Sequence, residues 1–251
     1  MAVLRTLASA LFWLYMAVSL TGFWLFVAPL WLVSVPFDPA RRFAHGYATV
    51  WARHFLAISP FWSVKVEGRK HVDRRKAYVL VANHQSAADI IVLYALDRHF
   101  KWVSKASNFR IPLLGWMMSM CGYVPLVRGD RGSREQMLAE CARQIAGGSS
   151  IMMFPEGTRS SDGELREFKR GAFALAVQAG VPVVPVVVEG TFPILAPRSW
   201  VFSRLRSAPI RIRVLAPIDP AEVGADAGRL QQRVHEAMAG GLAELRAAPA
   251  A

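Results

Sequence analysis

The longest apolar stretch of the chain lies at its beginning, where no charged residue occurs from Thr6 to Phe37. About 20 apolar residues span a bilayer, so this stretch is long enough for one crossing and too short for two. Gly22 and Pro29 interrupt it, which makes a bent, re-entrant hairpin an alternative. Residues 6–37 therefore predict an N-terminal helical membrane anchor, either single-pass or re-entrant.

Residues 38–58 have apolar side chains at helical spacing, with Asp38 as the expected N-cap and Pro39 as the first helical residue. One side of this helix is apolar, with Phe43, Tyr47, Val50, Trp51 and Phe55. Its basic and polar residues lie largely elsewhere: Arg41, Arg42, Thr49 and Arg53. A basic amphipathic helix beside a membrane segment is expected to lie on anionic lipid. The alternative is a helix that packs on its own domain.

Beyond residue 60, short apolar segments of strand character alternate with segments of helical character. The expected strands are 62–68, 77–82, 101–104, 123–127, 150–154, 181–188 and 210–215. The expected helices are 87–97, 112–120, 131–147, 170–179 and 228–247. This alternation predicts an α/β fold with a mixed, largely parallel sheet flanked by helices. Two parts are expected: residues 1–60 as the membrane-anchoring segment and residues 61–251 as the α/β domain.

The net charge of the chain indicates which kind of partner it binds. The chain has 30 Lys and Arg against 18 Asp and Glu, a net charge of +12, which favours an anionic partner such as acidic lipid or a phosphorylated ligand. We expect no nucleic acid, because the basic residues are scattered and the aromatic ones concentrate in the apolar segment. Cys121 and Cys141 lack metal-ligand spacing, so buried thiols and no metal are expected. Arg41, Arg42 and Arg53 follow the apolar segment, which predicts that everything after it is cytoplasmic.

The segment NHQSAAD, residues 83–89, sets His84 and Asp89 where a strand ends and a helix begins. Residues five apart in one helix point away from each other. The two side chains can meet only if His84 lies in the loop and Asp89 in the first helical turn, with Ser86 as N-cap. Asp89 would then fix the tautomer of His84 and leave its other nitrogen as a general base. The alternative is that Asp89 only caps the helix.

The segment FPEGTRS, residues 154–160, is a second candidate site. Gly157 permits a tight turn, and Arg159 can clamp a phosphate with two parallel hydrogen bonds. Arg128 and Lys105 follow two other expected strands, and ligands of such sheets usually bind at strand ends. The alternative is an ordinary loop with solvated charges. No GxSxG elbow and no evident Ser or Cys nucleophile accompanies these residues.

Four segments occur in the order NHQSAAD, GYVPLVR, FPEGTRS and VPVVPV. Over residues 60 to 220 this order resembles the glycerophospholipid acyltransferases, specifically the 1-acyl-sn-glycerol-3-phosphate acyltransferases. The resemblance implies that His84 and Asp89 are the catalytic pair and that Val181–Val186 shape the acyl-chain site. The substrate-binding residues that it implies are Lys105, Arg128, Glu156, Gly157, Thr158 and Arg159. Ser107 departs from the family, in which an acidic residue is common two positions after the Lys.

The reaction that this resemblance implies moves a fatty acyl group from acyl-CoA or acyl-ACP to the sn-2 hydroxyl of 1-acyl-sn-glycerol-3-phosphate, giving phosphatidic acid. No acyl-enzyme, cofactor or metal is expected. The expected location is the cytoplasmic side of a bacterial inner membrane, in contact with membrane lipid. One alternative is another acceptor on the same fold, such as glycerol-3-phosphate, a lyso-ornithine lipid or another lysolipid. The other is a non-catalytic basic protein of the membrane surface, in which His84 would be dispensable.

Overall fold

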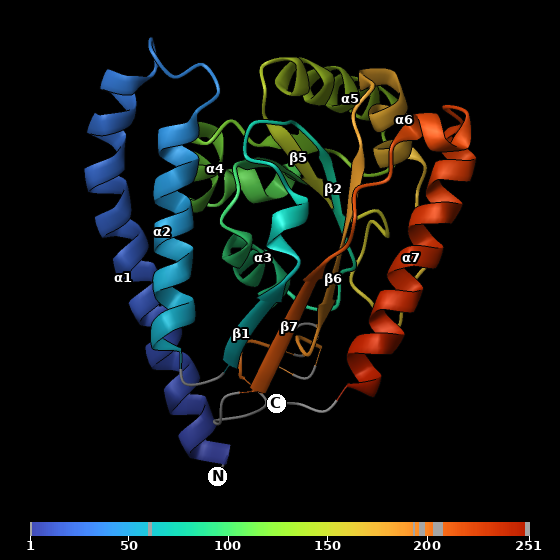
Figure 1. The fold of residues 1–251 in the computed structure, drawn as a ribbon. Helices are drawn as coiled ribbons and strands as arrows, with labels where there is room; N and C mark the ends of the chain where they lie inside the picture. The colour runs from blue at the N-terminus through green and yellow to red at the C-terminus, as the bar shows by residue number, and fades with distance from the viewer. Residues whose placement is uncertain (1, 60–61, 193, 196–198, 203–207, 249–251) are drawn as a thin grey trace.

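The computed structural model describes residues 2–59, 62–192, 194–195, 199–202 and 208–248. A seven-stranded sheet forms its centre, in the order β1-β7-β6-β2-β5-β3-β4 (Figure 1). The strands are β1 (Trp62–Glu67), β2 (Val79–Ala82), β3 (Phe100–Lys105), β4 (Val124–Leu126), β5 (Ser150–Met153), β6 (Val183–Glu189) and β7 (Ala208–Val214). All paired neighbours are parallel except β6 and β7. The predicted mixed, largely parallel sheet is confirmed.

Seven α-helices surround this sheet in the described part of the chain. They are α1 (Ala2–Ser34), α2 (Arg42–Ile58), α3 (Ala88–Val92), α4 (Leu114–Met120), α5 (Arg131–Ala146), α6 (Gly171–Ala179) and α7 (Ala227–Ala247). The expected helix 87–97 is α3 followed by a 3-10 turn over Leu93–Leu96. The expected helix 112–120 starts two residues late, after another 3-10 turn over Ala106–Arg110.

Each face of the sheet is covered by its own set of helices. In Figure 1, α5, α6 and α7 lie on one face and α1 to α4 on the other. Successive residues of β2 point to opposite faces: Val79 and Val81 pack with α5, α6 and α7, and Leu80 with the opposite core. All four residues of β2 are buried, as an apolar strand covered on both faces requires.

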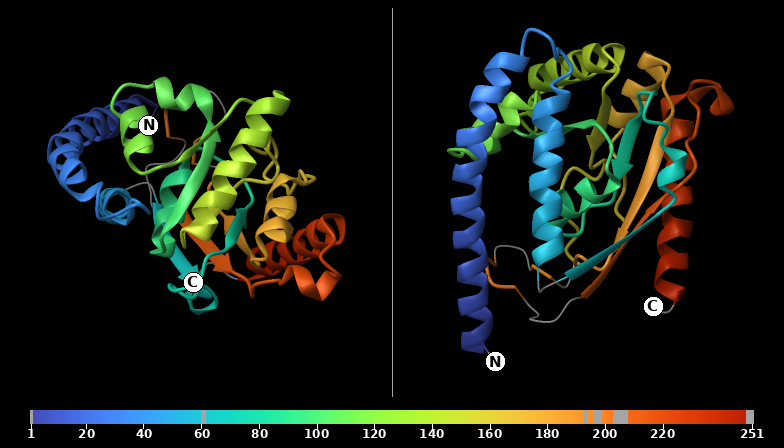
Figure 2. Two further views of the ribbon diagram at one scale, coloured as in Figure 1. Left: turned by 90° about the horizontal axis from the view of Figure 1, so that it is seen from above. Right: turned by 60° about the vertical axis from the view of Figure 1, so that its left-hand side comes forward.

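Helix α1 is continuous from Ala2 to Ser34, although it contains Gly22 and Pro29. The alternative of a hairpin bent at these residues is wrong, because the helix runs through both. It lies antiparallel to α2 along the side of the molecule (Figures 1 and 2). Contacts near both ends fix it there. The amide of Phe202 donates to Ser9 Oγ at 3.0 Å, and Trp31 Nε1 donates to the carbonyl of Met120 at 3.1 Å.

The opposite face of α1 is apolar and exposed. Its large exposed side chains are Leu4, Leu7, Leu11, Leu14, Val18, Leu25, Phe26, Leu30, Leu32 and Val33. The helix is long and apolar enough to cross a membrane by length and composition. An exposed apolar surface of this extent is typical of a site that meets lipid or another protein.

Helix α2 begins at Arg42 and not directly after Asp38, because Arg41 adopts a left-handed backbone with φ of 53°. The predicted N-cap at Asp38 and helix start at Pro39 are therefore wrong, since Arg41 is the N-cap. The Asp38 carboxylate still accepts the amide of Phe43 in the first turn, at 2.8 Å from Oδ2. The helix lies between α1 and the sheet-bearing part. Its buried side chains are Ala44, His45, Ala48, Thr49, Ala52 and Phe55. Through these residues the helix packs on the protein itself, whereas Phe43 and Val50 of the side expected on lipid are exposed. The expected position of that side on lipid remains a prediction.

A buried hydrogen-bond chain links α2 to the sheet. His45 accepts from Tyr123 Oη at Nδ1 (3.0 Å) and donates from Nε2 to the carbonyl of Arg98 (3.1 Å). Tyr123 in turn bonds Tyr94 between the hydroxyls at 2.6 Å. Burial lowers the pKa of His45 to about 3, so its imidazole is neutral and fits these roles. One core thus contains residues on both sides of the expected boundary at 60/61, which itself lies outside the described residues.

Candidate active site

His84 stands two residues after β2, in a loop that is fixed at its start. The side chain of Asn83 donates from Nδ2 to the carbonyl of Val188 (2.8 Å) and accepts the amide of the same residue (2.7 Å). The end of β2 is thereby tied to the neighbouring strand β6. His84 follows directly, so its backbone starts from a rigid position.

Asp89 meets His84 as the spacing predicted. Asp89 Oδ2 lies 2.8 Å from His84 Nδ1 and also accepts the amides of Gln85 (2.7 Å) and Ser86 (2.8 Å). The carboxylate is fully buried. Helix α3 starts at Ala88, and its N-cap is Ala87 without a side-chain cap hydrogen bond, so the predicted N-cap at Ser86 is wrong. Asp89 nevertheless lies in the first turn of the helix, where it can face His84. The alternative in which Asp89 only caps the helix is wrong.

The orientation of the imidazole leaves one nitrogen for chemistry. Because Nδ1 faces a carboxylate, it carries the proton, and Nε2 is the free acceptor of neutral His84. The ring stacks on Phe154, with centroids 3.9 Å apart and planes at 12°. His84 also lines the large cavity at this edge of the sheet. A neutral imidazole held in this way has the geometry of a general base.

Glu156 supports the backbone of His84 from behind. Its Oε1 accepts the His84 amide at 2.9 Å, and the amide of Ser160 donates to the His84 carbonyl at 2.7 Å. Burial raises the pKa of Glu156 to about 7, while the His84 amide opposes that rise. The segment FPEGTRS therefore supports the loop that bears His84. Glu156 does not line the cavity.

Gly157 lies at the cavity wall in a left-handed backbone with φ of 73°. A Cβ here would stand 2.7 Å from the ammonium nitrogen of Lys169, so the missing side chain leaves the space that Lys169 occupies. Thr158 is exposed and Arg159 half-buried, and neither lines the cavity. Their expected roles in substrate binding remain predictions.

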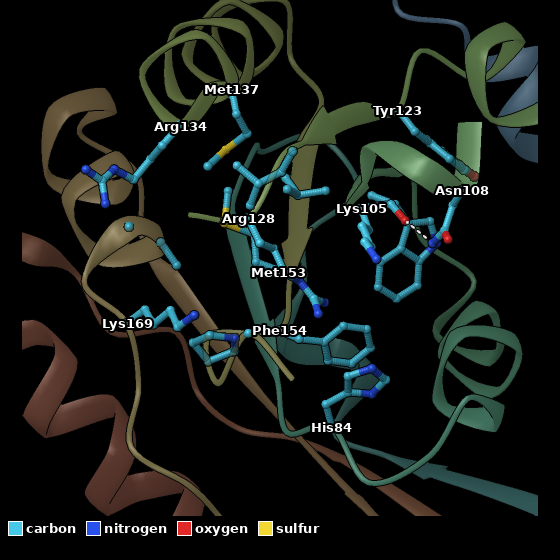
Figure 3. A pocket seen from close by; sticks show the side chains of 18 of the residues that line it. His84, Lys105, Asn108, Tyr123, Arg128, Arg134, Met137, Met153, Phe154 and Lys169 are labelled. Atoms are coloured by element: carbon cyan, nitrogen blue, oxygen red, sulfur yellow. Dashed lines mark hydrogen bonds between the residues drawn. The ribbon is translucent and has the colours of Figure 1, made fainter. Parts of the chain in front are cut away.

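The cavity has a volume of about 780 Å³ and two chemically different walls (Figure 3). One wall is aromatic and apolar, with Tyr94, Trp102, Leu114, Met117, Met118 and Tyr123. Basic side chains enter it from four elements or loops: Lys105, Arg128, Arg134, Lys169 and Arg170. No Asp or Glu is among the described residues that line it. A ligand with an anionic group and an apolar chain fits such a cavity.

Two of these cations, Lys105 and Arg128, were expected from the sequence. Lys169 and Arg170 were visible only as charges near a helix start. Arg134 was missed, although a signal existed: it lies three and four residues before Met137 and Leu138, which line the same cavity from α5.

The fourth segment, Val181–Val186, does not line this cavity, and its expected role in shaping an acyl-chain site remains a prediction. Val183, Val184 and Val186 of β6 are fully buried within the sheet. Helices cover both faces of β6, so its side chains reach only the two cores. The apolar wall comes from β3, α4, Tyr94 of the 3-10 turn after α3, and Tyr123 after α4.

No group of three or more His, Cys, Asp or Glu side chains converges in a metal-binding arrangement within the described ranges. Cys121 and Cys141 are buried thiols. The expectations of no metal and no cofactor remain predictions.

The sequence and the fold that form this site match known proteins. The family model described as Acyltransferase matches residues 63–189, which include the His84 loop, Arg128 and the FPEGTRS segment. This chain belongs to the acyltransferase family.

Its relatives narrow the comparison. The chloroplastic 1-acyl-sn-glycerol-3-phosphate acyltransferase LPAT1 of Arabidopsis thaliana is 37% identical over 219 residues, which cover 85% of this chain and 60% of that protein. The 1-acyl-sn-glycerol-3-phosphate acyltransferase of Haemophilus influenzae is 32% identical over 199 residues, 77% of this chain and 81% of that protein. This chain thus spans about 60% of the length of the plant relative and most of the bacterial one.

The fold extends the likeness to the whole chain. The crystal structure of the 1-acyl-sn-glycerophosphate acyltransferase PlsC from Thermotoga maritima matches with a TM-score of 0.84 and 26% identity. The match covers 100% of this chain and 99% of that one, so it includes α1 and α2 as well as the sheet.

Proposed function

We propose that this protein transfers a fatty acyl group from an acyl thioester to the sn-2 hydroxyl of 1-acyl-sn-glycerol-3-phosphate, giving phosphatidic acid. The observation that carries the proposal is the 2.8 Å contact between His84 Nδ1 and buried Asp89, which leaves Nε2 free at the cavity. The names of the relatives supply the acceptor and the product class.

In the proposed reaction, His84 Nε2 takes the proton of the acceptor hydroxyl as the oxygen attacks the thioester carbonyl. Asp89 stabilises the imidazolium that forms. The tetrahedral intermediate collapses with cleavage of the carbon–sulfur bond, and the imidazolium returns its proton to the leaving thiolate. Each proton and each bond is accounted for without an acyl-enzyme. Lys105 and Arg128 supply positive charge at the cavity for the anionic oxygens of substrate or intermediate.

The acyl chain and the phosphate of the acceptor each match the chemistry of one wall of the cavity. The apolar wall around Trp102 and Met117 suits a fatty acyl chain, and Lys105 and Arg128 suit its phosphate. Glycerol-3-phosphate would leave part of the apolar wall unfilled, and a lyso-ornithine lipid has no phosphate for the cations. These differences favour lysophosphatidate, and both alternatives enter the test as competing acceptors.

We also propose that α1 lies along the membrane and does not cross it. A helix of 33 residues is about 50 Å long at 1.5 Å per residue, beyond the roughly 30 Å of a hydrocarbon core. The contacts of Ser9 and Trp31 fix both halves of α1 against the rest of the protein. Its exposed apolar face would enter one leaflet, with the sheet-bearing part on the cytoplasmic face of a bacterial inner membrane.

The test is acyl transfer by the purified full chain in detergent. Lysophosphatidate, glycerol-3-phosphate and a lyso-ornithine lipid serve as acceptors, with acyl-CoA and acyl-ACP as donors. We expect phosphatidic acid as the main product and a loss on the order of 10²–10⁴-fold in His84→Ala. His54→Ala is the matched control, because His54 is an exposed histidine of α2 that bonds Tyr15. Near-normal transfer by folded His84→Ala protein would exclude the mechanism and leave a membrane-surface role.

A further inference from the structure

The five cations of the cavity exceed what one phosphate group of an acceptor requires. Lys105, Arg128, Arg134, Lys169 and Arg170 line it, and no carboxylate does so within the described chain. Their positions differ. In Figure 3 the side chain of Arg128 points toward Phe154, which stacks on His84, whereas Arg134 and Lys169 lie on the side of the cavity away from His84.

The side chains of Arg134 and Lys169 make no polar contact within the described part of the protein. Neither side chain has a hydrogen bond or an ion pair with any described residue. A neighbour on the same helix behaves differently, since Arg131 pairs with Glu135 at 2.9 Å. Arg170 differs from both, because its guanidinium lies beside Gly228 in the first turn of α7. Unpaired cations that face a cavity are candidates for binding an anion.

The backbone around Lys169 places its ammonium at the cavity wall. Its amide donates to the carbonyl of Pro155 at 2.8 Å, and its side chain runs over Gly157, where a Cβ would clash. The first turn of α6 follows at once, without a side-chain cap, and Gly171 lines the cavity. Its free amides add positive potential to the same wall. Arg134 reaches this space from the facing helix α5, one turn before buried Met137.

If the proposed function is correct, the covalent structures of the two substrates decide which anionic group Arg134 and Lys169 can bind. In lysophosphatidate the phosphate sits on the carbon next to the one that bears the reacting hydroxyl. It must therefore stay near His84, where Arg128 points. In acyl-CoA the pantetheine arm separates the thioester from the phosphates, so these need a second anionic subsite away from His84. We propose that Arg134 and Lys169 form this subsite and bind the phosphates of coenzyme A in the acyl donor.

The test measures equilibrium binding of coenzyme A to the full-length protein in detergent, because binding does not depend on turnover. Dephospho-coenzyme A and pantetheine are the truncated probes. Arg134→Ala and Lys169→Ala are compared with Arg131→Ala, the matched control on the outside of α5. We expect each cavity variant to weaken coenzyme A binding roughly three- to tenfold and Arg131→Ala to leave it unchanged. Arg134→Lys should recover part of the affinity.

Further outcomes separate this subsite from its alternatives. Pantetheine should bind the parent and the variants equally, and high salt should reduce the difference between them. Unchanged coenzyme A binding in folded Arg134→Ala and Lys169→Ala would overturn the proposal, even if acyl transfer proceeds. So would a selective loss of lysophosphatidate binding, of acyl-ACP use, or of binding to vesicles of anionic lipid. Absence of acyl transfer with intact, Arg134-dependent coenzyme A binding would contradict the proposed reaction alone.

Discussion

The main-chain amide of His84 donates a 2.9 Å hydrogen bond to Oε1 of Glu156, a residue 72 positions later in the chain. The position of the imidazole thus depends on a carboxyl group that does not line the cavity. Substitutions at Glu156 are therefore expected to act through His84 and through stability.

Glu156→Gln should change how stability depends on pH. Burial raises the pKa of Glu156 from 4.5 to about 7 in the folded protein. The folded state then binds an extra proton between these values, so the free energy of unfolding falls as pH rises from about 4.5 to about 7, by up to about 3 kcal/mol. Gln keeps the acceptor oxygen and cannot titrate. Urea unfolding at a series of pH values should show a flatter dependence in this window for the variant; parallel curves would contradict the raised pKa.

Asp89→Asn should reduce turnover and leave the fold intact. Three donors converge on Oδ2 of Asp89, and an amide oxygen can still accept them. The imidazolium that forms on His84 during the reaction loses its counter-charge. We expect kcat/KM to fall on the order of 10²–10⁴-fold. Initial rates measure this effect, with circular dichroism as the control for folding, and a loss of only a few-fold would show that the pair does not act as a unit.

Arg128→Ala and Arg159→Ala can be compared directly, because only Arg128 lines the cavity. A charge-assisted contact to phosphate contributes about 1.5–3 kcal/mol, so Arg128→Ala should raise the KM for lysophosphatidate roughly ten- to a hundredfold. The KM for the thioester should change much less. Steady-state rates with each substrate varied separately measure both values. A large acceptor effect in Arg159→Ala with none in Arg128→Ala would favour the role that the family resemblance implies for Arg159.

Lys101→Met should alter stability at alkaline pH. Lys101 is fully buried, its ammonium donates to the carbonyl of Cys121 at 2.6 Å, and burial lowers its pKa from 10.5 to about 8. The unfolded chain binds the extra proton between these values, so the free energy of unfolding should rise as pH rises from about 8 to about 10.5. Denaturant unfolding at a series of pH values should show this rise in the parent protein and not in Lys101→Met. An equal rise in Lys101→Met would assign it to other groups.

The exposed face of α1 predicts how the protein stays on membranes. Leu11 and Leu25 are more than half exposed on this face. Insertion of apolar side chains is not screened by salt, so the full chain should sediment with vesicles in high salt. Leu11→Glu with Leu25→Glu should release a large fraction of the protein. Release of the parent by salt alone would show that basic residues hold it on the surface.

Local signals in the sequence predicted the sheet and the pair of His84 and Asp89, because strand periodicity and helix capping involve near neighbours. The packing partners of α2 could not be predicted from such local signals. Its apolar residues Tyr47 and Trp51 contact α1, while His45 and Phe55 enter the core, and no local pattern shows which partner each face meets. Arg134 has a local signal, its helical spacing to Met137 and Leu138, but that spacing marks a cavity only once α5 has packed across the sheet.

The buried chain from His45 through Tyr123 to Tyr94 changes what the N-terminal segment means for protein engineering. Tyr94 and Tyr123 line the cavity, so α2 supplies a hydrogen-bond partner to the cavity wall. A chain shortened to residues 61–251 would lose that partner together with the apolar cover of Phe55. It would therefore be an unstable enzyme with an altered pocket and not a soluble version of the same one. Replacing the N-terminal segment with an unrelated hydrophobic helix would destabilise the protein for the same reason. The segment packs against the cavity wall in addition to anchoring the protein.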